Sequence, residues 1–218
     1  MSNILPLKID LHVHTCYSKD AVTNLADVIS YSRKRGLDGV AITDHDTIEG
    51  ALKFKEKRGF ILIPGIEVTT KSGHMLGLNL TTPIPKDLGL EETVKRIHEA
   101  HGIAVAAHPS AFLKKSLGSD AFKKTVEIDA VEVINSSTFP FSLSTRLSKG
   151  LAFRLNLPQT AGSDSHIPET IGLAYTIIEA EPDFNDIIKA IKKGSIVPYG
   201  KSVPLSLRFK KLWQKGKM

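Results

Sequence analysis

Residues 8–14 read KIDLHVH, and the regular alternation of polar and apolar side chains predicts a β-strand. Successive side chains of a strand point to opposite faces, so His12 and His14 are expected to share a face at the end of this strand. Two imidazoles placed in this way can bind one metal ion. A His-x-His pair also occurs on ordinary protein surfaces, so the rest of the sequence has to decide its meaning.

Strand-like and helix-like segments alternate along the rest of the chain. The further predicted strands are 38–43, 60–67, 73–80, 103–107, 130–135, 159–162, 173–179 and 195–199. The predicted helices are 23–35, capped by Thr23, then 47–57, 90–100, 143–153 and 184–193. Roughly seven βα units of this kind predict an α/β domain with a mainly parallel sheet, either open or closed into a barrel.

Potential metal ligands recur at the ends of these predicted strands or in the loops beside them. After His12 and His14 they are Asp20, Asp44, His45, Glu67, His74, His108, Asp164 and His166. Functional groups of parallel α/β domains gather at the carboxyl ends of the strands. The sequence therefore predicts that these side chains meet on one face of the domain.

The donor atoms of this set are imidazole nitrogen and carboxylate oxygen, without thiolate. This mixture suits zinc, manganese or iron in an open catalytic site, whereas structural zinc usually recruits several cysteines. The set exceeds what one ion can use, so two or three ions that share bridging carboxylates are expected. Clustered ions that generate hydroxide and stabilise both oxygens of an in-line displacement suit phosphoester hydrolysis.

Short motifs containing these residues follow one another in a characteristic order. They are DLHVHT (10–15), TDHD (43–46), PGIEV (64–68), GHMLG (73–77), AHP (107–109) and GSDSH (162–166). In residue type, order and strand context, they resemble the motifs of the PHP (polymerase and histidinol phosphatase) family, over residues 8 to about 180. The resemblance implies a distorted, TIM-like (β/α)7 barrel and a phosphoesterase site with two or three manganese, iron or zinc ions.

The same resemblance assigns the metal ligands by motif match. They are His12, His14, Asp20, His45, Glu67, His74, His108, Asp164 and His166, with Glu67 as a bridging carboxylate. Asp20 stands where family members have either Asp or His. The neighbouring Lys19 and Ala21 replace the commoner Ser and Gly, which is expected to alter the loop without removing the carboxylate.

The expected mechanism is attack on phosphorus by a hydroxide that bridges the metal ions, with an acid near the site protonating the leaving oxygen. The expected catalytic residues are Asp44, Glu67 and Asp164. Asp44 either orients a ligand or caps the following helix. The expected substrate-binding residues are Asn135, Arg146 and Lys71. For Asn135, the role of an ordinary turn residue after a strand is an equal alternative.

Composition predicts one globular domain with a basic tail. The chain has 218 residues, 41% of them hydrophobic and 24% charged, which excludes fibrous and largely disordered classes. The net charge is +6, but residues 201–218 hold six cations and no acid, so the body is neutral. We expect a phosphoesterase domain over 1–200 and an amphipathic tail over 201–218. The tail either packs on the barrel through Phe209, Leu212 and Trp213, which we favour, or binds nucleic acid by stacking on a base.

Residues outside the motifs receive simpler interpretations. Cys16 is the only cysteine, which excludes an intramolecular disulfide and indicates a reducing compartment; a packed thiol is expected. His98 and His101 match no motif and are expected to be solvated helix positions. No signal-like segment or membrane-length apolar run occurs, so a cytoplasmic protein without a membrane partner is predicted.

The leading hypothesis is a metal-dependent phosphatase or phosphodiesterase acting on a phosphomonoester, a nucleotide or the end of an oligonucleotide. The alternative is a non-catalytic RNA-binding subunit, because a ribonuclease P protein resembles this barrel without its metal ligands. Retention of every donor in this sequence favours the enzyme. Metal-dependent amide hydrolysis on a related barrel is a third hypothesis, which the motifs around Asp44 and Glu67 disfavour.

Overall fold

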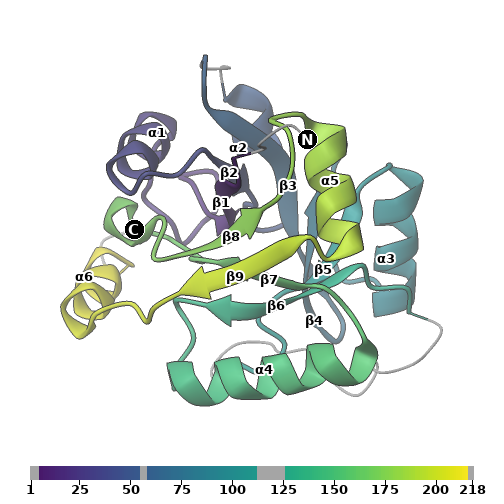
Figure 1. Ribbon diagram of the computed structural model, residues 1–218. Coiled ribbons are helices and arrows are strands. Elements are labelled where there is room, and N and C mark those ends of the chain that lie inside the picture. The colour runs from purple at the N-terminus through teal and green to yellow at the C-terminus, as the bar shows by residue number, and fades with distance from the viewer. Residues whose placement is uncertain (1–4, 55–57, 112–125, 216–218) are drawn as a thin grey trace.

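The computed structural model describes residues 5–54, 58–111 and 126–215, the last five of these without their side chains. In these residues a single sheet runs in the order β7-β6-β5-β4-β3-β2-β1-β8-β9. The strands are β1 (Leu7–Val13), β2 (Gly39–Ile42), β3 (Ile61–Thr70), β4 (Gly73–Leu78), β5 (Ile103–Ala106), β6 (Ala130–Asn135), β7 (Gln159–Gly162), β8 (Ala174–Ile178) and β9 (Ile196–Gly200). Figure 1 shows the sheet curving round on itself, with helices on its outside.

Hydrogen bonds also connect β7, at one edge of this strand order, to β8, and the residues that follow β7 to β1. Thr176 of β8 bonds both backbone groups of Ala161 in β7, at 2.9 and 3.0 Å. Just beyond β7, Asp164 N donates to the carbonyl of His12 at 2.8 Å, and His14 N donates to the carbonyl of Ser165 at 3.0 Å. The sheet is therefore a nearly closed barrel, which confirms the barrel alternative.

The expectation of a mainly parallel sheet is wrong. β1–β2, β2–β3, β5–β6 and β6–β7 pair in parallel, but β3–β4, β4–β5, β1–β8 and β8–β9 are antiparallel. Between β3 and β4 there is only the turn at Lys71 and Ser72, and a parallel crossover needs a dozen or more residues. The chain therefore departs from a regular alternation of strand and helix at this point.

The described helices are α1 (Leu25–Lys34), α2 (Glu49–Lys53), α3 (Leu90–Glu99), α4 (Phe141–Leu155), α5 (Phe184–Lys193) and α6 (Leu205–Lys215), with a short 3-10 turn η2 (Pro168–Thr170). α1 is capped by Asn24, whose side chain accepts from Asp27 N, and not by Thr23 as predicted. α2 is shorter than expected because Phe54 is extended and packs against Phe60; residues 55–57 of the predicted helix lie outside the described residues. None of these helices combines the length and hydrophobicity of a transmembrane helix.

Alternation along β1 separates the core from the polar side chains. Ile9 and Leu11 are buried in one apolar cluster with Ile187 and Ile191 of α5. The intervening Asp10 and His12 are equally buried but point to the opposite face, as the period of two requires. The apolar face of β1 thus packs in the core, and His12 and His14 lie on the opposite face of the sheet.

The tail is in contact with the barrel before α6 begins. Lys201 N donates to the carbonyl of Leu173 at 2.9 Å, and Val203 N donates to the carbonyl of Ser136 at 3.0 Å. These bonds attach the start of the tail to the barrel, but the expectation that Phe209 packs there is wrong, since it is 70% exposed. The division of function between 1–200 and 201–218 stays a prediction. The side chains of Leu212 and Trp213 lie outside the described residues.

Gly162, at the end of β7, touches the chain so closely that a side chain cannot be added. A Cβ atom there would lie 2.4 Å from His12 Cβ and 2.8 Å from Glu132 Oε1. We expect Gly162→Ala to lower the free energy of unfolding by about 1–3 kcal/mol, because β1 or β6 would have to shift. Urea unfolding measures this change.

The matched control is Gly150→Ala, in the interior of α4, where a Cβ atom meets nothing within 4 Å. There the substitution is expected to raise stability by about 0.5–1 kcal/mol, because alanine favours the helix. Equal unfolding curves for the two variants would contradict the close approach at β7.

Candidate metal centre

The structure brings all the predicted metal ligands to one end of the barrel. Most of them stand at strand ends or in the loops beside them, but Glu67 lies inside β3, which continues to Thr70 and not only to residue 67 as predicted. The residues are His12, His14, Asp20, His45, Glu67, His74, His108, Asp164 and His166. The common face predicted from the sequence therefore exists.

Glu67 lies at the centre of the cluster and is completely buried. Its Oε2 is 3.2 Å from His12 Nε2, 3.1 Å from His14 Nε2 and 3.2 Å from His45 Nδ1. Its Oε1 is 3.0 Å from His74 Nδ1 and 2.9 Å from His108 Nε2. The two oxygens face different imidazoles, which is the arrangement that a bridging carboxylate needs.

One group of donors consists of His12, His14, Asp164 and Glu67 Oε2. The Nε2 atoms of His12 and His14 are 3.1 Å apart, and Asp164 Oδ1 is 3.5 Å from His14 Nε2 and 4.0 Å from His12 Nε2. Atoms that bind one ion at about 2.1 Å lie about 3.0–3.5 Å from one another. The group fits a divalent metal with mixed nitrogen and oxygen ligands.

Two further groups surround the first. Glu67 Oε1 with His74 and His108 forms the second. The third contains His166, whose Nε2 is 3.1 Å from Asp20 Oδ2, and His45, whose Nε2 is 3.9 Å from Asp20 Oδ1. Asp20 is 25% exposed, whereas Glu67 is inaccessible, so the third group forms the open side of the cluster.

Glu132 in β6 supports the cluster, and the sequence analysis did not single it out. Its Oε1 accepts from His12 Nδ1 at 2.9 Å, and its Oε2 accepts from the backbone N–H of His108 at 2.9 Å. A proton held on Nδ1 leaves the lone pair of His12 Nε2 for a metal ion. The available signal was an acidic residue inside an otherwise apolar strand, AVEVIN.

Asp44 lies outside the donor groups. Its carboxylate accepts from Thr15 N at 2.6 Å, from Thr15 Oγ1 at 2.7 Å and from Ser18 Oγ at 2.8 Å. Ser18 Oγ in turn lies 3.2 Å from His14 Nδ1 and accepts from His45 N at 2.9 Å. Asp44 is therefore connected to His14 and His45 through Ser18, which is the geometry that the predicted orienting role requires. The helix-capping alternative is wrong because α2 has no side-chain cap.

The electrostatics of the cluster favour a charged Glu67. Burial raises the pKa of Glu67, but the charges of His12 and His45 and the hydrogen bond from His108 outweigh it and hold the pKa well below its usual range. Burial lowers the pKa of His45 to about 4 and also lowers the pKa of His14. For His12 the carboxylates Glu132 and Glu67 overcome burial and raise the pKa to about 9.

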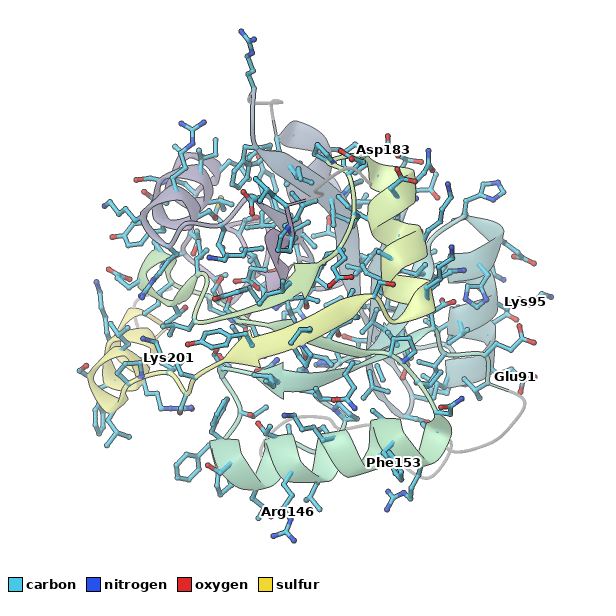
Figure 2. The ribbon with its side chains drawn as sticks, in the orientation of Figure 1. Glu91, Lys95, Arg146, Phe153, Asp183 and Lys201 are labelled. Atoms are coloured by element: carbon cyan, nitrogen blue, oxygen red, sulfur yellow. The ribbon has the colours of Figure 1, made fainter. Side chains whose placement is uncertain are left out.

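The predicted substrate-binding residues are not brought together. Asn135 Nδ2 donates to Glu132 Oε2 at 2.9 Å and to Asp164 Oδ2 at 3.0 Å, so it is bound to the ligand shell. Lys71 is exposed in the turn between β3 and β4. Arg146 is exposed on α4, and Figure 2 shows its side chain pointing away from the sheet. A side chain with that direction does not reach the metal ligands.

Two other expectations are wrong. Cys16 is exposed rather than packed, because the chain turns outward after β1. His98 is not a solvated position: its Nε2 lies 2.8 Å from Asp129 Oδ2, which also accepts from Ala104 N at 2.8 Å. His98 thus ties α3 to the start of β5, away from the cluster. His101 is exposed, as expected.

A cleft of about 730 Å³ opens on the exposed side of the cluster, beside Asp20 and His45. Tyr17 and Lys19 line it from the loop after β1, and the segment Pro83, Ile84, Pro85 and Lys86 lines it as well. The donor cluster is therefore accessible to a ligand from this side.

Comparisons with known proteins agree with this fold. The family model described as PHP-associated matches residues 143–196. An uncharacterised protein of Methanocaldococcus jannaschii is 37% identical over 143 residues, which is 60% of this chain and 82% of the relative.

Solved structures with lower sequence identity have a similar fold. A two-domain protein of Bacteroides vulgatus that contains a predicted PHP-like metal-dependent phosphoesterase is similar with a TM-score of 0.71 and 17% identity, over 96% of this chain and 70% of that one. The lesion-specific endonuclease of Pyrococcus furiosus is similar with a TM-score of 0.72 and 20% identity, over 90% and 59%. These similarities show the barrel fold.

The contact between Glu132 and His12 predicts an effect on metal affinity. In Glu132→Gln the amide accepts a weaker hydrogen bond from His12, so the affinity for one ion per chain is expected to fall by about 10–100-fold. Equilibrium dialysis with Zn²⁺ or Mn²⁺ measures the loss. Glu92→Gln, which removes only an exposed pair with Arg96, is the control. Unchanged affinity in Glu132→Gln would show that this bond does not orient His12.

Proposed function

The chain belongs to the PHP family, and from this premise we propose that it is a metal-dependent phosphoesterase that hydrolyses its substrate at the cluster around Glu67. The observation that carries the proposal is the division of the two Glu67 oxygens between different imidazoles. A carboxylate in that position would be able to hold two ions within one site. Paired ions are the usual means of cleaving a phosphoester bond by in-line displacement.

The residues that would hold the ions are the donors already described. Bound divalent ions would lower the pKa of a coordinated water and neutralise the phosphate oxygens. Imidazole-rich sites favour zinc, manganese or iron over magnesium or calcium. Three sets of close donor atoms allow two or three ions: His12, His14 and Asp164; His14, His45 and His166; and His45, Glu67 and His74. Glu67 and Asp164 would hold the ions, Glu132 and Ser18 contact the imidazoles of His12 and His14, and Asp44 accepts a hydrogen bond from Ser18.

The cleft beside Asp20 is the proposed site for the rest of the substrate. Lys19 and Lys86 line it and form no ion pair with the residues that the structure describes. Asp20, Asp46 and Glu49 line the cleft as well, so its formal charge is not positive. Lys19 and Lys86 are the groups in the lining that can pair with a phosphate group of a ligand.

The substrate proposed is a phosphomonoester, a nucleotide or the end of an oligonucleotide. The similarity to an endonuclease and to a phosphoesterase-containing protein supports this chemistry, since both names describe phosphoester substrates. A size of about 730 Å³ admits a nucleotide-sized group beside the cluster.

The first test is metal-dependent turnover. The purified chain is treated with a chelator, reloaded with Mn²⁺ or Zn²⁺, and assayed on phosphomonoesters, phosphodiesters and short RNA. Chelation is expected to abolish hydrolysis and reloading to restore it. His12→Ala and Asp164→Ala are each expected to lower kcat/KM by about 100-fold or more, because each removes a metal ligand.

The control for these variants is His101→Asn, at an exposed position where φ is +61° and asparagine is well tolerated. Its activity is expected to equal that of the unmodified chain. Full activity in His12→Ala and Asp164→Ala would overturn the site. RNA binding without any metal-dependent turnover would favour the non-catalytic alternative.

The place of Lys86 in the cleft makes a separate kinetic prediction. Lys86→Ala is expected to raise KM about fivefold while leaving kcat unchanged, because an exposed charge contributes about 1 kcal/mol to binding. Steady-state kinetics at low salt measure this effect. Lys95→Ala, which lies on α3 and pairs with Glu99, is the control. An equal KM for both variants would show that Lys86 and the cleft do not contribute to substrate binding.

A further inference from the structure

Arg208 of α6 binds the turn that follows β6. Its Nη1 donates to the carbonyl of Ser137 at 3.0 Å, and its Nη2 donates to the carbonyls of Thr138 at 2.9 Å and Ser136 at 3.3 Å. Its Nε donates to the carbonyl of Val203 at 3.1 Å. The guanidinium therefore holds three successive carbonyls of one turn, which a single flexible ammonium does not do equally well.

The same turn is bonded to residues of the metal centre on its other side. Ser137 N donates to Asn135 Oδ1 at 3.0 Å, and Ser137 Oγ donates to the carbonyl of Asp164 at 3.0 Å. Thr138 Oγ1 donates to the carbonyl of Asn135 at 2.8 Å. The position of the turn thus determines the position of the Asn135 side chain and of the Asp164 backbone.

Asp164 depends on such support. Its φ is +53°, in the left-handed region that non-glycine residues seldom adopt, so neighbouring bonds have to maintain this backbone. Asn135 Nδ2 donates to Asp164 Oδ2 at 3.0 Å, which leaves Oδ1 toward His14 and His12. A movement of the turn would release both restraints on the carboxylate.

We propose that Arg208 is a positioning residue of the metal centre, through which the C-terminal helix α6 holds Asp164 in the geometry that a metal ion requires. Figure 1 shows α6 beside the end of β6 from which the connection to α4 leaves. The proposal rests on the proposed metal centre, and not on the identity of the substrate. It makes residues 201–208 part of the working site rather than an appendage.

The internal bonds also limit what the tail offers to nucleic acid. Arg208 is engaged with backbone carbonyls, and Lys210 forms an ion pair with Glu169 at the end of η2. These two cations of the tail are used within the chain. The tail therefore acts first on the barrel, in line with the packing interpretation.

The test measures metal binding in the full-length chain, independently of turnover. Arg208→Ala is expected to lower the affinity for one Mn²⁺ or Zn²⁺ ion per chain by about 10–100-fold, measured by equilibrium dialysis. Lys210→Ala, on the same helix, removes only the ion pair with Glu169 and is expected to bind metal as the unmodified chain does. Arg208→Lys keeps the charge and the stem, and is expected to give a smaller loss.

A double-substitution cycle separates positioning from general stability. If Arg208 acts in part through the Asn135 side chain, the variant carrying both Arg208→Ala and Asn135→Ala loses less binding free energy for the metal ion than the sum of the two single losses. Metal affinity equal to that of the unmodified chain in Arg208→Ala, with only a lower Tm, would overturn the proposal. If Arg208→Ala does not fold, the metal affinity of Arg208→Lys is measured instead, and an affinity equal to that of the unmodified chain would overturn the proposal. A chain that binds metal with this dependence but hydrolyses no phosphoester would refute the proposed function and leave the positioning role standing.

Discussion

The burial of the Glu67 carboxylate among five imidazoles is the interaction on which the rest of the site depends. An ionised carboxylate without access to water costs several kcal/mol unless its surroundings compensate it. Here every oxygen contact is an imidazole nitrogen at 2.9–3.2 Å, from the ends of β1 and β4 and from the loops after β2 and β5. Metal ions between these atoms would replace proton-mediated contacts by coordination. The strands must therefore end in register around one residue of β3.

A second layer of buried carboxylates keeps that arrangement rigid. Glu132 holds His12 and the backbone of His108, and Asp44 holds Ser18 against His14. Asp10 accepts from the backbone of Ser163 and Gly172, which fixes the loop that carries Asp164; burial raises the pKa of Asp10 to about 6 despite these bonds. Buried polar groups stabilise a fold only when each has its hydrogen-bond partners. These networks therefore favour a single geometry of the donor atoms.

Much of this site was predictable because its chemistry is local in the chain. A pair such as His12 and His14 reveals itself by the two-residue period of a strand, and Glu67 and His108 by their place after apolar runs. Glu132 was missed because an acidic residue inside a buried strand signals only that it needs a partner, without saying which one. Arg146 was predicted near the substrate but lies on the exposed face of α4. The sequence of α4 is only weakly amphipathic, so it does not show which face of the helix is buried.

The strands and the potential donor residues could be predicted from the sequence alone, because side-chain periodicity and donor type are properties of short segments. The antiparallel pairing of β3, β4 and β5, the exposure of Cys16 and the contact of Arg208 with the turn beside Asp164 became visible only in the folded chain. The contacts of Arg208 join residues up to 72 positions apart in the chain, and their geometry follows from the closure of the barrel. No local sequence pattern predicts contacts between residues so far apart in the chain, because they form only when the sheet has folded.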